Sequence, residues 1–227
     1  MKKKILIILV LMVSLVGLTA CKTNEINLSD YIIEERNNLF TAQDDLYTVT
    51  LSSGNREENY DLDGEVTTLV PFGVITLARN DRAPLANDSY TYYLKVNDES
   101  YTGFLIQSPV DNTYSVDIGN AIDSNAVVEI QITFTGYSFN QPMTCVSNDF
   151  AVDKTSALEI ANEQLKEDIQ NVMSDSNVKI EVAMKIMKDY SSESNSYYWY
   201  VGVISTNGDT LGILIDANTS EIIAKKA

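Results

Sequence analysis

Alternation of apolar and polar residues dominates the chain between residues 45 and 150. The clearest segment runs from Val127 to Thr135, where every second side chain from Val128 to Phe134 is apolar and the intervening ones are polar. A period of two residues places the two kinds of side chain on opposite faces of a strand, and such strands form antiparallel sheets with one buried face. The pattern predicts an all-β domain over residues 30–150.

Four further segments share this alternation: Tyr47–Leu51, Val66–Ala78, Tyr90–Val96 and Tyr101–Gln107. Gly, Asn, Asp and Pro residues separate the segments, as expected for turns. Pro71 interrupts the second segment and predicts two strands or one bent strand, because proline donates no ladder hydrogen bond. About seven segments at this spacing resemble an immunoglobulin-like β-sandwich in architecture, although the Cys…Trp…Cys pattern of that family is absent.

The period changes from two to 3.6 near Asp153, which predicts a domain boundary at about this residue. Asp153 or Thr155 is a candidate N-cap for an amphipathic helix, whose apolar stripe consists of Leu158, Ala161, Leu165 and Ile169. Strands are expected next, joined in part by the hairpin signal Asn207-Gly208, over residues 178–190, 198–205, 210–215 and 221–224. Residues 153–227 are thus predicted to form a small α+β domain, which makes the whole chain α+β.

This C-terminal part resembles a PepSY-type domain. The residues that carry the resemblance are Ala157–Ala161, Tyr198–Val201, Leu211–Ala217 and Thr219–Ile223. Ser220 departs from the family, which usually has glycine in the turn before the last strand. The family is thought to inhibit or regulate peptidases and has no catalytic residues, so the resemblance implies a non-catalytic, protein-binding domain.

The first 21 residues resemble the signal sequence of bacterial lipoproteins. Lysines 2–4 precede an apolar run, Ile5–Gly17, which is shorter than the roughly 20 residues of a membrane-spanning helix. The run ends in a sequence that looks like a lipobox: Leu18, Thr19, Ala20 and Cys21. The resemblance implies a signal peptide over residues 1–20, diacylglycerol and palmitate on Cys21, and a location on the extracytoplasmic face of the cell membrane.

A tether and a short helix are expected between the lipid anchor and the sandwich. Residues 21–29 are short and mostly polar, as in a flexible spacer. Ser29 or Asp30 is a candidate N-cap for a helix over residues 31–38. Ile32, Ile33 and Leu39 would dock this helix on the folded part.

Charge and composition exclude several classes of function. The chain has 32 acidic and 16 basic residues, and removal of residues 1–20 takes away three of the lysines, which leaves a net charge of −19. Such a surface repels nucleic acids and anionic headgroups, so a nucleic-acid partner is excluded and the lipid must supply the membrane attachment. The chain also contains no histidine, which excludes Ser-His-Asp, Cys-His and His-ligated zinc chemistry.

Cys145, the one cysteine after Cys21, is expected to be a small core residue.

Two groups of residues are candidate ligand sites. Asn59, Asp61, Asp63 and Gly64 match the start of a calcium loop, but Val70 stands where the bidentate glutamate belongs, so a solvated acidic turn is the competing interpretation. Tyrosines cluster twice and are expected either to stack on a sugar or peptide or to pack the sheets. The clusters are Tyr90, Tyr92, Tyr93 and Tyr101, and Tyr197, Tyr198, Trp199 and Tyr200. Trp199 itself is expected in the core.

These observations lead to three hypotheses of function. The first is a non-enzymatic, membrane-anchored lipoprotein that binds or regulates an envelope protein, with a peptidase as the candidate partner. The second is a lipoprotein that binds wall carbohydrate or calcium through the β-sandwich. The third is a hydrolase that uses paired carboxylates as acid and base. No cofactor besides the covalent lipid is expected.

Overall fold

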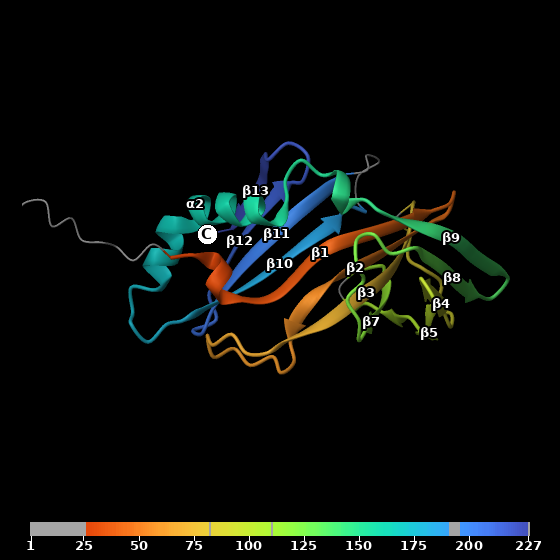
Figure 1. Ribbon diagram of the computed structural model, residues 1–227, viewed down its shortest axis with the longest axis horizontal. Helices are drawn as coiled ribbons and strands as arrows, with labels where there is room; N and C mark the ends of the chain where they lie inside the picture. Colours follow the sequence, from red (N-terminus) through yellow and green to blue (C-terminus); the bar gives the residue numbers. More distant parts are fainter. Residues whose placement is uncertain (1–25, 82, 110, 191–195, 227) are drawn as a thin grey trace, which may run out of the picture.

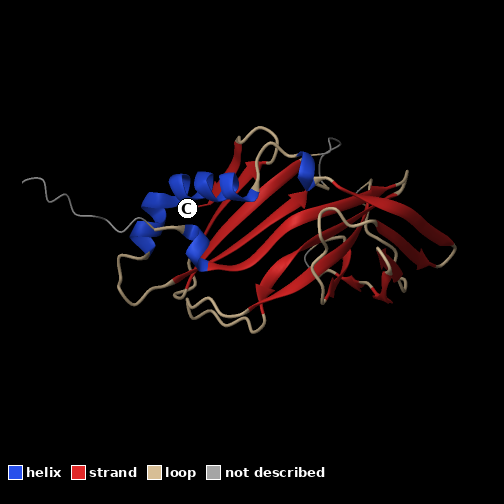
Figure 2. Cartoon of the chain, viewed as in Figure 1, coloured by secondary structure: helices blue, strands red, loops and turns tan. Residues whose placement is uncertain are grey.

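The protein is mostly β, which corrects the α+β prediction. In a computed structural model that describes residues 26–81, 83–109, 111–190 and 196–226, 51% of the described residues lie in strands and 13% in helices. The strands join into one strongly curved, almost wholly antiparallel sheet (Figures 1 and 2). The predicted immunoglobulin-like sandwich followed by a separate PepSY-like domain is therefore wrong.

The sheet contains thirteen described strands, most of them close to segments that alternate in the sequence. Their bounds are β1 (Ile32–Gln43), β2 (Tyr47–Glu57), β3 (Leu69–Arg79), β4 (Thr91–Val96), β5 (Glu99–Phe104), β6 (Ile106–Gln107), β7 (Tyr114–Ile118), β8 (Val128–Phe134), β9 (Tyr137–Cys145), β10 (Ile180–Lys188), β11 (Tyr197–Ser205), β12 (Thr210–Asp216) and β13 (Ile222–Lys226). Pro71 lies inside β3, so Val66–Ala78 contributes one strand and not two.

Strand β1 is the branch point of the sheet. One side of β1 pairs with β2 along most of its length. The other side pairs first with β10, from Ile32 to Arg36, in the one parallel ladder among the described strands. The same side then pairs with β9, where Phe40 lies opposite the half-buried Cys145. Strands β10–β13 therefore extend a sheet that begins near the N-terminal end of the described chain (Figure 1).

Two hydrophobic cores lie on opposite sides of β1. The first lies between α2 (Lys154–Val172) and strands β10–β12, and it includes Leu39 of β1. The second lies where the sheet folds back on itself, between β2, β3, β4 and β8, and it includes Phe40 of β1. Because successive side chains of a strand point to opposite faces, neighbouring residues of one strand belong to different cores.

The helix predicted over residues 31–38 is wrong. A 3₁₀ turn, η1 (Leu28–Tyr31), comes first, and the chain then enters β1 directly. The polar run Glu34–Asn38 gives β1 no alternation of apolar and polar residues, because charged side chains lie on both faces of the strand. Each face supplies partners for these charges. Glu35 accepts a hydrogen bond from Lys154 of α2 over 2.7 Å, while Glu34 pairs with Arg36 on the opposite face.

The helix predicted after Asp153 is confirmed as a local element. Asp153 is the N-cap of α2, and its side chain accepts a hydrogen bond from the Ser156 backbone N–H over 2.8 Å. The residues of the predicted stripe are all buried against the sheet: Leu158, Ala161, Leu165 and Ile169. Figure 2 shows α2 on one face of the sheet only, so the other face of strands β10–β12 is left without a helix.

We expect the two cores to unfold together because they share β1. Replacing Leu39 or Phe40 by alanine is expected to lower the free energy of unfolding by about 2–5 kcal/mol. Trp199, the one tryptophan of the chain, lies in the first core, so its fluorescence during urea denaturation reports on that core. Phe40→Ala, in the second core, is expected to shift this transition as well.

The matched control for this experiment is Val127→Ala, because Val127 is 68% exposed and its truncation is expected to change stability by less than about 0.5 kcal/mol. A Trp199 transition that stays unchanged in Phe40→Ala would show that the two cores unfold independently.

Candidate functional site

The lipobox residues Leu18, Thr19, Ala20 and Cys21 lie outside the described residues, the first of which is Ile26. Within the described part of the chain, no helix has the length and apolar character needed to cross a membrane. Lipidation of Cys21 stays a prediction from the sequence.

The acidic stretch that resembles a calcium loop connects β2 to β3. Asn59, Asp61 and Asp63 are exposed there, and Asp63 accepts a hydrogen bond from the Glu65 backbone N–H over 2.8 Å. The three residues help to line a hollow of about 220 Å³. In the described residues, no group of three or more Asp, Glu, Cys or His side chains is arranged to hold a metal ion. Calcium binding here stays a prediction.

Gly64 fixes this loop to β10. Its backbone N–H donates to Oε1 of Glu181 over 2.7 Å, and Lys179 forms an ion pair with Glu65 at 2.9 Å. Gly64 has a φ of +72°, and a Cβ added to it would lie 2.1 Å from the Cβ of Lys179. Glu181 is fully buried, and its Oε2 has no hydrogen-bond partner among the described residues. The Gly64 contact therefore stabilises a carboxylate that is otherwise costly to bury.

The first tyrosine cluster does not form one surface. Tyr90 and Tyr92 are buried in the second core, and the Tyr90 hydroxyl donates to the Ala86 carbonyl over 3.0 Å. Burial raises the pKa of Tyr90 to about 12. Tyr93 points the other way and is 44% exposed. Of the three tyrosines predicted to contact a ligand, only Tyr93 faces solvent, and its contact with a ligand stays a prediction.

The second tyrosine cluster is divided between the two faces of β11. Tyr197 and Trp199 lie in the first core, where Trp199 Nε1 donates to the Val152 carbonyl over 2.8 Å. The expectation that Trp199 is a core residue is confirmed. Tyr198 and Tyr200 alternate with them and are half-buried. They lie on the face of the sheet opposite α2, which we call the open face.

Strand β13 forms an edge of the sheet. Among the described strands it pairs only with β12, and all its residues are exposed, with Ile222 at 37% and Ile223 at 45%. The unpaired N–H and C=O groups of an edge strand can add a further strand. Lys226, at the end of β13, makes this edge basic in an acidic protein, while the charge of Lys225 is balanced by Asp168.

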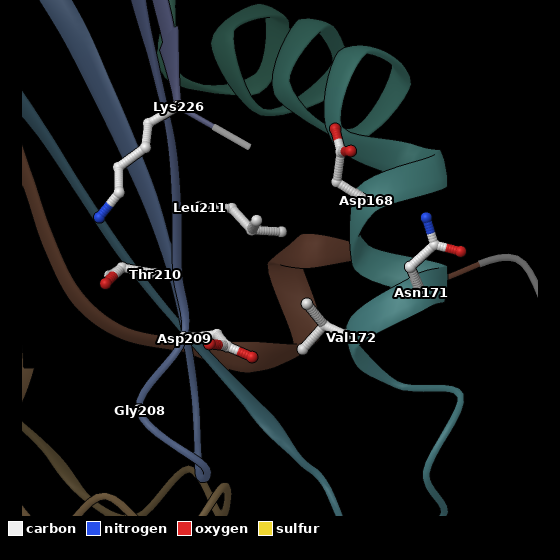
Figure 3. Close-up of a pocket in the computed structure, with 8 residues that line it drawn as sticks. All are labelled: Asp168, Asn171, Val172, Gly208, Asp209, Thr210, Leu211 and Lys226. Atoms are coloured by element: carbon white, nitrogen blue, oxygen red, sulfur yellow. The ribbon is translucent and has the colours of Figure 1, made fainter.

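A hollow of about 470 Å³ lies beside this edge, between α2 and the end of the β11–β12 hairpin. Figure 3 shows Val172 of α2 and Leu211 of β12 pointing toward each other across it. Asp168 and Asn171 border the hollow on the helix, and Asp168 pairs with Lys225 at 2.7 Å. The hollow therefore offers an apolar floor with a polar rim next to a free strand edge.

Neither the basic edge nor the open face was predicted from the sequence. The open face includes Lys185 of β10, which lies opposite Arg36 of β1. In the sequence, Lys185 belongs to the alternating segment 178–190, where a lysine between Met184 and Ile186 indicates only an outward-facing position. Its neighbour Arg36 lies in the stretch predicted to be a helix, so no sequence signal could place the two side by side. The free edge of β13 depends on the order of the strands, which alternation does not specify.

The comparisons with known proteins identify no relative. No protein-family model, curated protein or solved structure matches the chain.

The docking of the β2–β3 loop leads to a test with two glycines. Gly64 and Gly208 both have positive φ, but a Cβ at Gly208 would meet no atom within 4 Å. Gly208→Ala is therefore expected to cost roughly 1–2 kcal/mol from backbone strain alone. Gly64→Ala is expected to cost more, because it also displaces the loop from Lys179 and removes the hydrogen bond to Glu181.

The measurement is amide hydrogen exchange of residues 58–68, together with urea denaturation of both variants. Faster exchange in the loop is expected in Gly64→Ala and not in Gly208→Ala. Equal loss of stability in the two variants, with unchanged exchange in the loop, would contradict the docking role of Gly64.

Proposed function

We propose that the protein is a membrane-anchored lipoprotein on the extracytoplasmic face of a bacterial cell membrane. The observation that carries this proposal is the sequence Leu18-Thr19-Ala20-Cys21 directly after a short apolar run that follows three lysines. The first described residue, Ile26, follows Cys21 by only a few residues. A lipid on Cys21 would therefore keep the folded part close to the membrane surface, although the net charge is negative.

Lipidation is tested by labelling cells that produce the protein with radioactive palmitate. The full-length chain is expected to carry the label and to remain in the membrane fraction, because acylation makes Cys21 the membrane anchor. Cys21→Ser is expected to lose both the label and the membrane association. The matched control is Cys145→Ser, which removes the other cysteine and is expected to keep the label. Label retained in Cys21→Ser, or absent from the wild-type chain, would overturn the proposal.

The folded part is proposed to bind an envelope protein and not to catalyse a reaction. The free edge of β13 supports this proposal, because an extended segment of a partner can pair with such an edge while neighbouring pockets receive its side chains. The hollow beside Leu211 is one such pocket. Lys226 favours an acidic segment, whereas Lys225 already pairs with Asp168. The resemblance to a PepSY-type domain was the reason to expect a peptidase as partner, and the fold contradicts that resemblance. We therefore propose an envelope protein without naming a peptidase.

A photo-crosslinking residue in place of Ile223 tests this binding mode in living cells. The variant is expected to crosslink one envelope protein reproducibly, because position 223 lies on the free edge. The same residue in place of Val127 is the control, since Val127 is more exposed but lies outside the strands. The contact on the partner is expected in an extended acidic segment, located by mass spectrometry. Equal crosslinking from positions 127 and 223, or contacts outside such a segment, would contradict strand addition at β13.

A second candidate function is binding of wall carbohydrate. Tyr198 and Tyr200 favour it, because half-buried tyrosines on a sheet face without a helix offer an aromatic surface with a polar edge. The expected position is the open face of β10–β12, and not the cluster around Tyr90 that the sequence suggested.

A further inference from the structure

Positively charged side chains gather on the open face of the sheet, although the protein is strongly acidic. Arg36 and Arg56 each have a carboxylate partner: Arg36 Nη2 lies 2.8 Å from Glu34 Oε1, and Arg56 Nη1 lies 2.6 Å from Asp117 Oδ2. Lys185 differs from both. In the part of the chain that the structure describes, no carboxylate lies within ion-pair distance of its ammonium group. Its charge is therefore not balanced by a direct contact.

The sheet holds a second cation next to Lys185. In the parallel ladder, Lys185 of β10 lies directly opposite Arg36 of β1, and like charges in this position destabilise a sheet. Burial and the charge of Arg36 both lower the pKa of Lys185, while Glu34 has the opposite effect. Glu34 is the carboxylate that pairs with Arg36. The fold thus brings an unpaired ammonium and a guanidinium together on one surface.

Tyr200 holds the Lys185 side chain from the other side. Lys185 lies opposite Tyr200 in the antiparallel ladder, and its Nζ is 5.6 Å from the centre of the tyrosine ring. The ring in turn lies against the backbone at two glycines. A Cβ at Gly202 would come within 2.6 Å of the Tyr200 hydroxyl, and one at Gly212 within 3.5 Å of the ring. The ammonium is therefore supported by a ring that has little freedom to move.

The negative charge of the whole protein does not prevent an anion from binding at this place. At physiological ionic strength, charges more than about 8 Å apart in solvent are largely screened. The nearest charges therefore decide the local preference, and these are Lys185, Arg36 and the already paired Glu34. An oxyanion would supply the partner that Lys185 lacks and would relieve its repulsion with Arg36.

We propose that Lys185 and Arg36 bind the oxyanion of a small soluble ligand, a carboxylate or phosphate group carried by a sugar. Tyr198, on the same face of β11 as Tyr200, offers its ring to the apolar side of such a sugar. Lys185 is the charged anchor for the oxyanion. Arg36, which already donates to Glu34 and Ser52, adds its positive charge beside it. The inference is independent of the lipid on Cys21 and of a partner at β13, and it gives the open face of the second candidate function a charged, soluble ligand.

The test is isothermal titration of the full-length protein in detergent with glucuronate, inorganic phosphate and glucose. Glucuronate is expected to bind best, phosphate more weakly, and uncharged glucose not measurably. Lys185→Met keeps the length of the side chain and removes its charge, and it is expected to weaken glucuronate binding by about tenfold or more, as for loss of a charged hydrogen bond. Lys185→Arg is expected to keep the binding.

Lys95→Met is the matched control, because Lys95 is an exposed strand lysine on β4, far along the sheet from β10. It is expected to leave the affinity unchanged. Binding of glucuronate that survives Lys185→Met, or the absence of binding of both anions to the wild-type protein, overturns the proposal. Binding of phosphate without glucuronate supports the oxyanion site and assigns it to a phosphate group and not to a carboxylate.

A second measurement does not depend on the variants folding. Brief acetylation of the wild-type protein, followed by peptide mass spectrometry, gives the rate at Lys185 and at Lys95. Glucuronate is expected to slow the reaction at Lys185 only. Equal protection of both lysines, or of neither, contradicts the site. Protection of Lys185 by phosphatidylglycerol vesicles and not by glucuronate would place the anion on the membrane and overturn the soluble ligand.

Discussion

The parallel pairing of β1 with β10 is the interaction on which the rest of the structure depends. It joins Ile32–Arg36 to a strand almost 150 residues later in the chain. Without this ladder, α2 and strands β10–β13 would form a separate layer with an unpaired edge on β10. With it, β1 is an inner strand whose two faces contribute to two cores. Loss of packing on either face therefore weakens hydrogen bonds that both cores need.

The same pairing creates the surfaces proposed for binding. By pairing one edge of the β10–β13 group with β1, it leaves β13 as the free edge at the far side. It also sets Arg36 opposite Lys185, a juxtaposition of like charges that neither strand would form alone. The helix covers one face of these strands (Figure 2). Lys185, Tyr198 and Tyr200 therefore remain on the other face. Both candidate binding surfaces are thus consequences of strand order.

The acidic β2–β3 loop shows how a motif can have a structural use. Gly64 was expected in the turn of a calcium loop, and it does adopt the positive φ that such a turn requires. Its backbone N–H, however, donates to buried Glu181, and its missing side chain makes room for Lys179. A glycine between acidic residues thus has a sufficient explanation in the close packing of the loop on β10.

The sequence by itself determined the local elements, because alternation and capping are properties of neighbouring residues. It located β8 through its alternation, α2 through the Asp153 cap, and the β11–β12 hairpin through Asn207-Gly208. The tertiary structure alone decided the pairing of β1 with β10, the division of Leu39 and Phe40 between two cores, and the meeting of Lys185 with Arg36. Period two tells which face of a strand is buried but not which strand lies beside it. A polar strand such as β1, whose charges find partners on both faces, therefore has no recognisable pattern until the fold supplies those partners.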